Sequence, residues 1–172
     1  MAITLRTFRE LKNFVVVAED GSVIGKVEDI LVDSFGVIQG FRIDKKGMFL
    51  RDCFLPISAP FRFVGDRMVI SKKDLRPITD KIRDYQPVGE KGYIGKQVIS
   101  EHGELKGLVQ DVYFRSDLGR IEALEVSEGW FADLVDGRTH VNCNDVMQDG
   151  EKFLTLKNRG GGTTHEMPEL LE

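Results

Sequence analysis

A stretch near the start of this chain of 172 residues occurs twice, and the duplication constrains the fold more than any other feature. Its glycines and one aspartate stand at Gly21, Gly25 and Asp29 and return 82 residues later at Gly103, Gly107 and Asp111. The offset becomes 83 at Gly36 and Gly119, because the turn of the second copy is one residue longer. A unit that is written twice in one chain predicts two domains of the same fold.

Each copy has the pattern of short β strands separated by turns. In the first copy, a buried strand is predicted at residues 14–18, a longer one at 23–32, and two more at 37–44 and 48–55. Gly25 stands inside the long strand, where a glycine indicates a bulge or bend that lets a small sheet curl. The sequence therefore predicts an all-β chain of two tandem small antiparallel β-barrels.

The predicted first domain spans residues 1–76 and the second spans residues 93–158. Residues 77–92 between them contain two prolines and many charges, which is typical of a charged linker. Residues 159–172 have too little apolar surface to order themselves, so we expect a disordered tail. Residues 167–171 within this tail leave a short docking motif as the alternative.

The composition is that of a soluble globular protein. Hydrophobic residues make up 41% of the chain and charged residues 30%, and the formal net charge is −4. No apolar run is long enough to cross a bilayer and no basic region leads into a hydrophobic one, so we expect neither membrane insertion nor a secretory signal. Cys53 and Cys143 do not occupy equivalent positions in the two copies, which favours two free thiols in a reducing, cytoplasmic location.

The repeated motifs resemble those of the PRC-barrel family. In the first copy the resemblance is carried by Gly25-Lys26-Val27-Glu28-Asp29, Gly36-Val37-Ile38 and Leu55-Pro56. The second copy diverges more, because Leu108 replaces the lysine and Val141-Asn142 stands in place of Leu-Pro. The family includes the cytoplasmic part of the photosynthetic reaction-centre H subunit and the C-terminal part of a ribosome maturation factor. The resemblance implies a small antiparallel barrel that serves as a docking or assembly module without catalysis of its own.

The carboxylates Asp29 and Asp111 recur inside the matched strands, so they are the first candidates for chemistry. Acid–base catalysis needs a second group within reach and a cleft, and nothing at the same spacing supplies either. We interpret both aspartates as structural residues that cap a turn or accept backbone N–H groups at the end of each barrel. No nucleophile stands beside a recognisable base and no glycine-rich loop precedes a helix, so we predict no catalytic residue and no cofactor.

A metal site would have to come from a few scattered residues. The candidates are Cys53, His102, His140, Cys143 and Asp145, and only His140 and Cys143 are close in sequence. A structural zinc site needs four ligands in paired short spacings, so we predict no metal.

A basic stretch is the basis of a nucleic-acid hypothesis. It contains Lys72, Lys73, Arg76, Lys81 and Arg83, with Tyr85 and Lys91 nearby. Phosphate binding requires clustered positive charge, and the aspartates at positions 74, 80 and 84 interrupt this cluster. A solvated linker is the alternative interpretation.

Large apolar residues follow one hairpin tip in both copies. Gly47-Met48-Phe49 and Gly129-Trp130-Phe131 share the offset of 82. We predict that Met48, Phe49, Trp130 and Phe131 bind a partner, because an exposed apolar patch usually marks a protein interface. Packing inside or between the barrels is the alternative.

Together these features predict a non-enzymatic adaptor that binds another protein, or a second copy of itself as a homodimer. Docking through strand edges and through the Trp130 region is the expected mode. An RNA-associated or ribosome-assembly accessory factor is the first alternative, and a small-ligand sensor is the second. No small-molecule substrate is expected.

Overall fold

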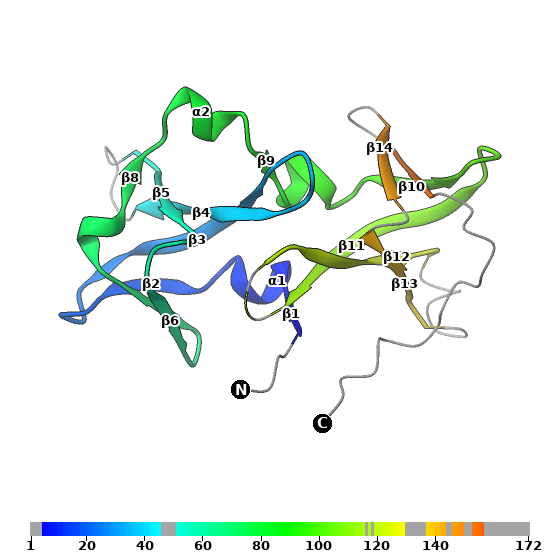
Figure 1. The fold of residues 1–172 in the computed structure, drawn as a ribbon. Coiled ribbons are helices and arrows are strands. Elements are labelled where there is room, and N and C mark those ends of the chain that lie inside the picture. The colour runs from blue at the N-terminus through cyan, green and yellow to red at the C-terminus, as the bar shows by residue number, and fades with distance from the viewer. Residues whose placement is uncertain are drawn as a thin grey trace. The chain divides into compact units, whose positions relative to one another are not determined.

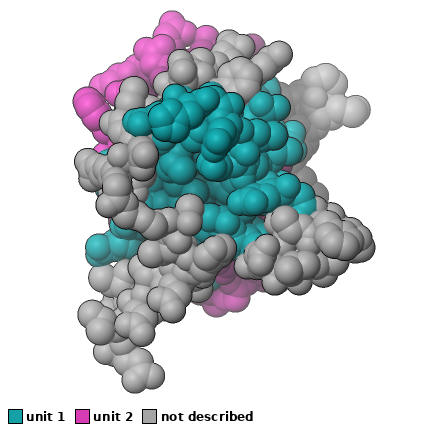
Figure 2. Space-filling model, turned by 90° about the vertical axis from the view of Figure 1, so that its right-hand side faces the viewer, with its two compact units in different colours: residues 1–7, 90–172 teal, residues 8–89 magenta. Residues whose placement is uncertain are grey.

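The computed structural model describes residues 5–45, 51–115, 117, 119–129, 137–143, 146–149 and 153–156. The chain divides into two compact units, of which unit 1 holds residues 1–7 and 90–172 and unit 2 holds residues 8–89 (Figures 1 and 2). Each unit is built on one sheet. The predicted tail, residues 159–172, lies outside the described residues.

Unit 2 contains an eight-stranded sheet in the order β6-β7-β2-β3-β4-β5-β8, with β9 paired to β3. Its strands are β2 (Val15–Ala18), β3 (Val23–Val32), β4 (Ile38–Lys45), β5 (Cys53–Pro56), β6 (Phe61–Val64), β7 (Arg67–Ile70), β8 (Arg76–Pro77) and β9 (Gln86–Pro87). The helical segments described in it are single turns: α1 (Phe8–Leu11), η1 (Lys72–Asp74) and α2 (Asp80–Arg83).

Unit 1 contains a seven-stranded sheet in the order β13-β12-β11-β10-β15-β14, with β1 paired to β11. Its strands are β1 (Leu5–Thr7), β10 (Gln97–Ser100), β11 (Leu105–Arg115), β12 (Ile121–Ser127), β13 (Thr139–Asn142), β14 (Val146–Asp149) and β15 (Phe153–Leu156). One turn of π-helix, Gly89–Tyr93, precedes β10. The predicted β class and the duplication are therefore confirmed.

The strand registers of the two units match residue for residue. Asp29 lies opposite Arg42 in unit 2, and the residues at the same places in unit 1, Asp111 and Glu125, are also paired. The irregularities repeat as well. The extra residue is on β3 at Glu28 and on β11 at Gln110, and a second extra residue lies on the partner strand, at Gln39 of β4 and at Glu122 of β12. The two repeats therefore share the same pattern of strand pairing, including the positions at which that pairing is irregular.

The bend predicted at Gly25 lies next to a register shift. The β2–β3 pairing passes from Val16 opposite Gly25 to Val17 opposite Val23, so Ile24 is an extra residue. Gly25 is also paired with Lys45 of β4, and a β-carbon there would overlap the carbonyl oxygen of Asp44. Glycine is required because β4 approaches the bent strand too closely for a side chain.

Apolar residues with the period of a strand form the core of each sheet. In unit 2 the fully buried side chains include Val16, Val27, Ile30, Phe41, Ile43 and Leu55. Val98, Val109, Val112 and Leu124 occupy the matching positions of unit 1 and are equally buried. Burial of these branched side chains against each other stabilises each sheet.

Each sheet contains a parallel pair among its described strands, so the prediction of antiparallel barrels is wrong in this detail. β2 runs parallel to β7, and β10 runs parallel to β15. The last hairpin of each unit returns to the first strand of the same unit after three intervening strands. A sequence pattern identifies the strands, but it does not show which of them become neighbours after such a return.

The strand that leads into each repeat belongs to the sheet of the other repeat. β1 pairs with β11, placing Thr7 opposite Tyr113, while β9 pairs with β3, placing Pro87 opposite Leu31. Leu31 and Tyr113 are equivalent in the repeat, so the exchange is reciprocal. The compact units are consequently divided at residues 7/8 and 89/90, rather than at the ends of the predicted domains.

The segment expected as a charged linker, residues 77–92, carries strand pairs and a helical turn along one side of the unit 2 sheet (Figure 1). Ile82 packs against Leu31 and Phe54, and Tyr85 is partly buried on the same cluster. The rings of Tyr85 and Phe54 have their centroids 6.1 Å apart. A small number of apolar side chains on one face is enough to hold a mostly charged segment against the sheet. The composition of the segment does not reveal such a face.

We expect Gly25→Ala to lower the free energy of unfolding by about 3 kcal/mol, because the added methyl group must displace the backbone of β4. Gly36→Ala is the matched control. Gly36 has a φ of 73° and open space around its position for a β-carbon, so only the backbone strain of about 1 kcal/mol applies. Urea denaturation measures both. Equal losses for the two variants would contradict the close approach of β4.

Candidate interaction site

Asp29 is a structural acceptor, as the sequence predicted. Its Oδ1 accepts backbone N–H groups from Ile30 at 2.8 Å, Val88 at 3.0 Å and Gly89 at 2.9 Å. Burial raises the pKa of Asp29, and the three N–H bonds together with the Arg42 charge oppose this rise. One carboxylate therefore joins the bulge of β3 to the chain that follows β9.

Asp111 repeats part of this arrangement in unit 1. It is 6% exposed, and its Oδ1 accepts the backbone N–H of Val112 at 2.8 Å. Where Asp29 faces Arg42 across the strand pair, Asp111 faces Glu125. The recurring aspartates thus share a backbone role, but their side-chain surroundings differ in charge.

Asp29→Ala is expected to lower the free energy of unfolding by about 3 kcal/mol, because it leaves three backbone N–H groups without their acceptor. Asp29→Asn keeps an oxygen at the same place, and we expect it to cost about 1 kcal/mol or less. Chemical denaturation at neutral pH separates the two outcomes. A loss for the asparagine variant as large as for alanine would mean that the charge, rather than the acceptor, stabilises this junction.

Glu28 is the extra residue of the same bulge and contributes a dependence of stability on pH. Burial and the Asp52 charge raise the pKa of Glu28, while the Arg42 charge opposes the rise. A raised pKa in the folded state means that the folded chain holds the proton more tightly than the unfolded chain. The stability contribution of this group is therefore lost as the pH rises through that raised value.

Replacing Glu28 with the glutamine that occupies the equivalent position 110 is expected to raise stability at pH 7 by up to about 1 kcal/mol. The gain should disappear toward pH 4, where Glu28 of the parent chain is protonated. Denaturation midpoints of both proteins across this pH range measure the difference. A gain that persists unchanged at pH 4 would exclude titration of Glu28 as its cause.

The other residues considered in the sequence are not gathered into one site. Within the described ranges, no group of three or more His, Cys, Asp or Glu side chains is placed to hold a metal ion. Cys53 and Cys143 are free, and burial raises the pKa of the Cys143 thiol. Asp145 lies outside the described residues. His102 is exposed in a turn.

Two of the basic residues form ion pairs. Lys72 Nζ lies 3.1 Å from Asp20, and Arg83 Nη1 lies 2.8 Å from Asp80. Tyr85, the aromatic residue of the stretch, packs on Phe54. These contacts reduce the positive charge and the aromatic surface that the stretch presents to a nucleic acid.

Met48, Phe49, Trp130 and Phe131, the residues predicted to bind a partner, all lie outside the described residues. Their role stays a prediction.

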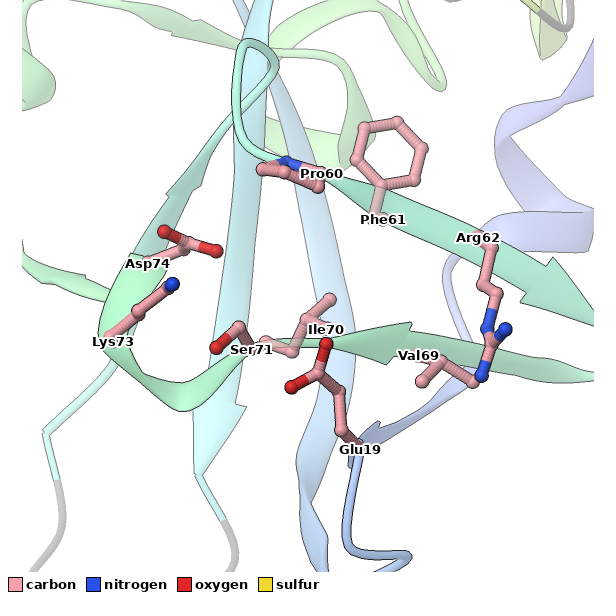
Figure 3. A pocket seen from close by; sticks show the side chains of 9 residues that line it. All are labelled: Glu19, Pro60, Phe61, Arg62, Val69, Ile70, Ser71, Lys73 and Asp74. Atoms are coloured by element: carbon pink, nitrogen blue, oxygen red, sulfur yellow. The ribbon is translucent and has the colours of Figure 1, made fainter.

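A pocket that the sequence did not reveal lies beside the β6–β7 hairpin of unit 2 (Figure 3). Its volume is ≈ 300 Å³. The lining residues come from the hairpin, from the chain just before and after it and from the β2–β3 turn: Glu19, Pro60, Phe61, Arg62, Val69, Ile70, Ser71, Lys73 and Asp74. This volume is at the lower end of the range of pockets that hold small ligands.

Aromatic packing holds the apolar part of this pocket in place. The ring of Phe61 makes edge contacts with Phe41, at a centroid distance of 5.4 Å, and with Phe63, at 5.6 Å. Ile70, the last residue of β7, is 1% exposed. Alternation along β6, where Phe61 and Phe63 are half-buried and Arg62 and Val64 are exposed, is the sequence signal that marks this strand as half-covered.

The charged part of the pocket is balanced. Arg62 and Lys73 are basic, and Glu19 and Asp74 are acidic. In Figure 3, Lys73 and Asp74 lie together at one side and Arg62 lies at the other. Oδ2 of Asp74 is buried without a hydrogen-bond partner, so an acceptor at the pocket is unsatisfied.

An ion pair close by ties η1 to the β2–β3 turn. Lys72 of η1 bonds to Asp20, which follows Glu19. Hydrogen bonds from Ser22 and the Lys72 ammonium hold the pKa of Asp20 below its ordinary value. The two segments that carry Lys73 and Glu19 are therefore joined through neighbouring residues.

Comparisons with known proteins agree with the duplication. A family model described as PRC-barrel domain matches residues 4–76 and again residues 93–161. The chain is 31% identical over 158 residues to a Bacillus subtilis (strain 168) protein called uncharacterized protein YrrD, covering 87% of this chain and 85% of that protein. No helix among the described residues is long and apolar enough to cross a membrane.

Proposed function

The chain belongs to the PRC-barrel family through both of its halves, and on this basis we propose that it is a non-enzymatic adaptor that binds a segment of another protein. Each sheet closes into a small barrel in this proposal, and the barrel is a rigid support for its surface. The pocket beside β6 and β7 is the docking site. The observation that carries the proposal is the combination of a fixed apolar floor with two basic and two acidic side chains at its border.

Polypeptide is the ligand that fits this combination best. A peptide can present an apolar side chain together with charges of both signs, and the pocket offers apolar side chains as well as basic and acidic ones. Burial of one apolar side chain against Phe61 and Ile70 contributes about 2 kcal/mol.

A nucleic acid fits the site less well. Phosphate binding draws on a concentration of basic residues, whereas Glu19 and Asp74 offset Arg62 and Lys73 here. A role without catalysis is supported by Asp29, because a carboxylate that accepts three backbone N–H groups is committed to the fold. An RNA-associated role and a small-ligand sensor are distinguished from the adaptor by the experiment below.

Selection of binders from a displayed peptide library against the purified protein tests the adaptor function. We expect the selected peptides to lose affinity about tenfold when Arg62 and Lys73 are both changed to glutamate, because two charge pairs become repulsive. Lys81→Glu is the matched control, since Lys81 is exposed on α2 and does not line the pocket. It should leave the affinity unchanged.

Two results would overturn the docking site. Peptides that bind the double variant and the parent protein equally well would place the binding surface elsewhere. Failure to select any peptide, together with RNA binding that weakens steeply between low and moderate salt, would favour the RNA-associated role.

A further inference from the structure

Four neighbouring strands of unit 2, β3, β2, β7 and β6, carry apolar residues on both sides of the sheet. On one side, Val16 and Met68 lie opposite each other and are fully buried in the core. The residues that alternate with them point to the other side and form two rows across the strands. The first row consists of Val23, Val17, Val69 and Arg62, each opposite the next in the strand registers.

The second row adds two basic residues to this side of the sheet. It consists of Lys26, Val15, Arg67 and Val64, again each opposite the next. We call the two rows together the outer face of unit 2. Val17, at its centre, is 5% exposed, whereas Val64 is 55% exposed and the basic side chains are exposed as well.

The basic side chains of the outer face do not pair with acidic groups of the chain. Within the described ranges, none of Lys26, Arg62 and Arg67 forms an ion pair or a side-chain hydrogen bond. Asp44 of β4 lies opposite Lys26 at the border of the face and offsets part of the charge. The outer face therefore combines valines with basic groups that have no ion-pair partner in the described chain.

Unit 1 shows that the fold does not require these charges. The positions of Lys26, Arg67 and Arg62 are occupied in the second repeat by Leu108, Phe153 and Met147. Both repeats have the same strand pairing, so the backbone forms with or without basic residues at these three positions. A role of the charges in binding explains their presence in unit 2 better than a role in folding.

We propose that the outer face of unit 2 binds an acidic segment of a partner protein, with apolar residues of that segment lying on the valines. The inference rests on the proposed docking function and specifies the chemistry of the partner. Charge complementarity is the argument for this occupant, because carboxylates are the protein groups that pair with lysine and arginine. The outer face is also continuous with the pocket, since Arg62 and Val69 belong to both (Figure 3).

Two other anionic partners fit the outer face less well. Surfaces that bind single-stranded nucleic acid present aromatic side chains on which the bases stack, and no residue of the two rows is aromatic. Protein segments that lie on anionic membranes place Trp, Phe or Leu among the lipids, whereas the outer face offers the shorter side chain of valine. A polypeptide with acidic and apolar residues matches both components of the face.

Selection from a displayed peptide library against the full-length protein tests the inference. We expect the selected peptides to be enriched in Asp and Glu next to apolar residues. Lys26→Glu combined with Arg67→Glu alters the part of the outer face that does not line the pocket. This double variant should bind the peptides about tenfold more weakly, because repulsion replaces attraction. Binding to the parent protein should also weaken as salt is added.

Lys81→Glu combined with Lys106→Glu is the matched control. Both lysines are exposed and lie outside the outer face, and the change in net charge is the same. We expect this variant to keep the affinity of the parent protein. Lys26→Gln combined with Arg67→Gln covers the case in which the glutamate variant does not fold, and it should cause a smaller loss because it removes attraction without adding repulsion.

The outcomes separate this inference from the proposed docking pocket. Peptides that lose affinity when Arg62 and Lys73 are changed, but not when Lys26 and Arg67 are changed, would overturn the inference and leave the pocket in place. The opposite result would support the outer face around Lys26 and Arg67 and overturn the pocket. Binding of a poly(U) oligonucleotide or of phosphatidylserine vesicles that depends on Lys26 and Arg67, while peptide binding does not, would overturn the inference in favour of a nucleic acid or a membrane.

Discussion

The long strand of each unit has to bend while it stays hydrogen-bonded on both sides, and the rest of the fold depends on how that bend is made. In β3 an extra residue next to Gly25 and a second one at Glu28 provide the curvature, and β4 follows the bent strand so closely that position 25 has no room for a side chain. Asp29 then uses one oxygen to hold the bulge and the incoming chain together. The same irregularities in β11 show that curvature, as well as sequence, was duplicated.

The parts of the structure that depend on local pattern could be predicted. Strand positions, the β class, the bend at Gly25 and the backbone role of Asp29 follow from glycines, β-branched runs and a polar residue inside an apolar strand. The pairing of strands that are far apart in the sequence could not be predicted. Nothing local to Val15–Ala18 shows that β7 will lie parallel to it, and nothing local to Leu5–Thr7 shows that it will join the sheet of the second repeat.

The pocket and the packing of residues 77–92 on the unit 2 sheet were missed for a related reason. Residues 77–92 read as a charged linker because most of their side chains are polar, yet a few apolar ones, including Ile82 and Tyr85, decide where the segment lies. The pocket has no motif of its own, because it forms where a hairpin, a turn and a short helical segment converge. The two repeats also differ on this side of the sheet, where Leu31 and Phe54 in one correspond to Tyr113 and His140 in the other. One backbone frame therefore carries two different surfaces.

The reciprocal exchange of leading strands has a consequence for how such a protein can be divided. Cleavage of the chain between the two repeats would separate β1 from β11 and β9 from β3. Neither fragment would then contain all the strands of its sheet. Both crossings lie together, since a β-carbon on Gly89 would come within 3.0 Å of the Phe8 ring. If the two repeats were produced as separate chains, these strands could pair only in trans, in a complex whose formation depends on concentration. The connection of both repeats in one polypeptide makes the same pairing intramolecular and independent of concentration.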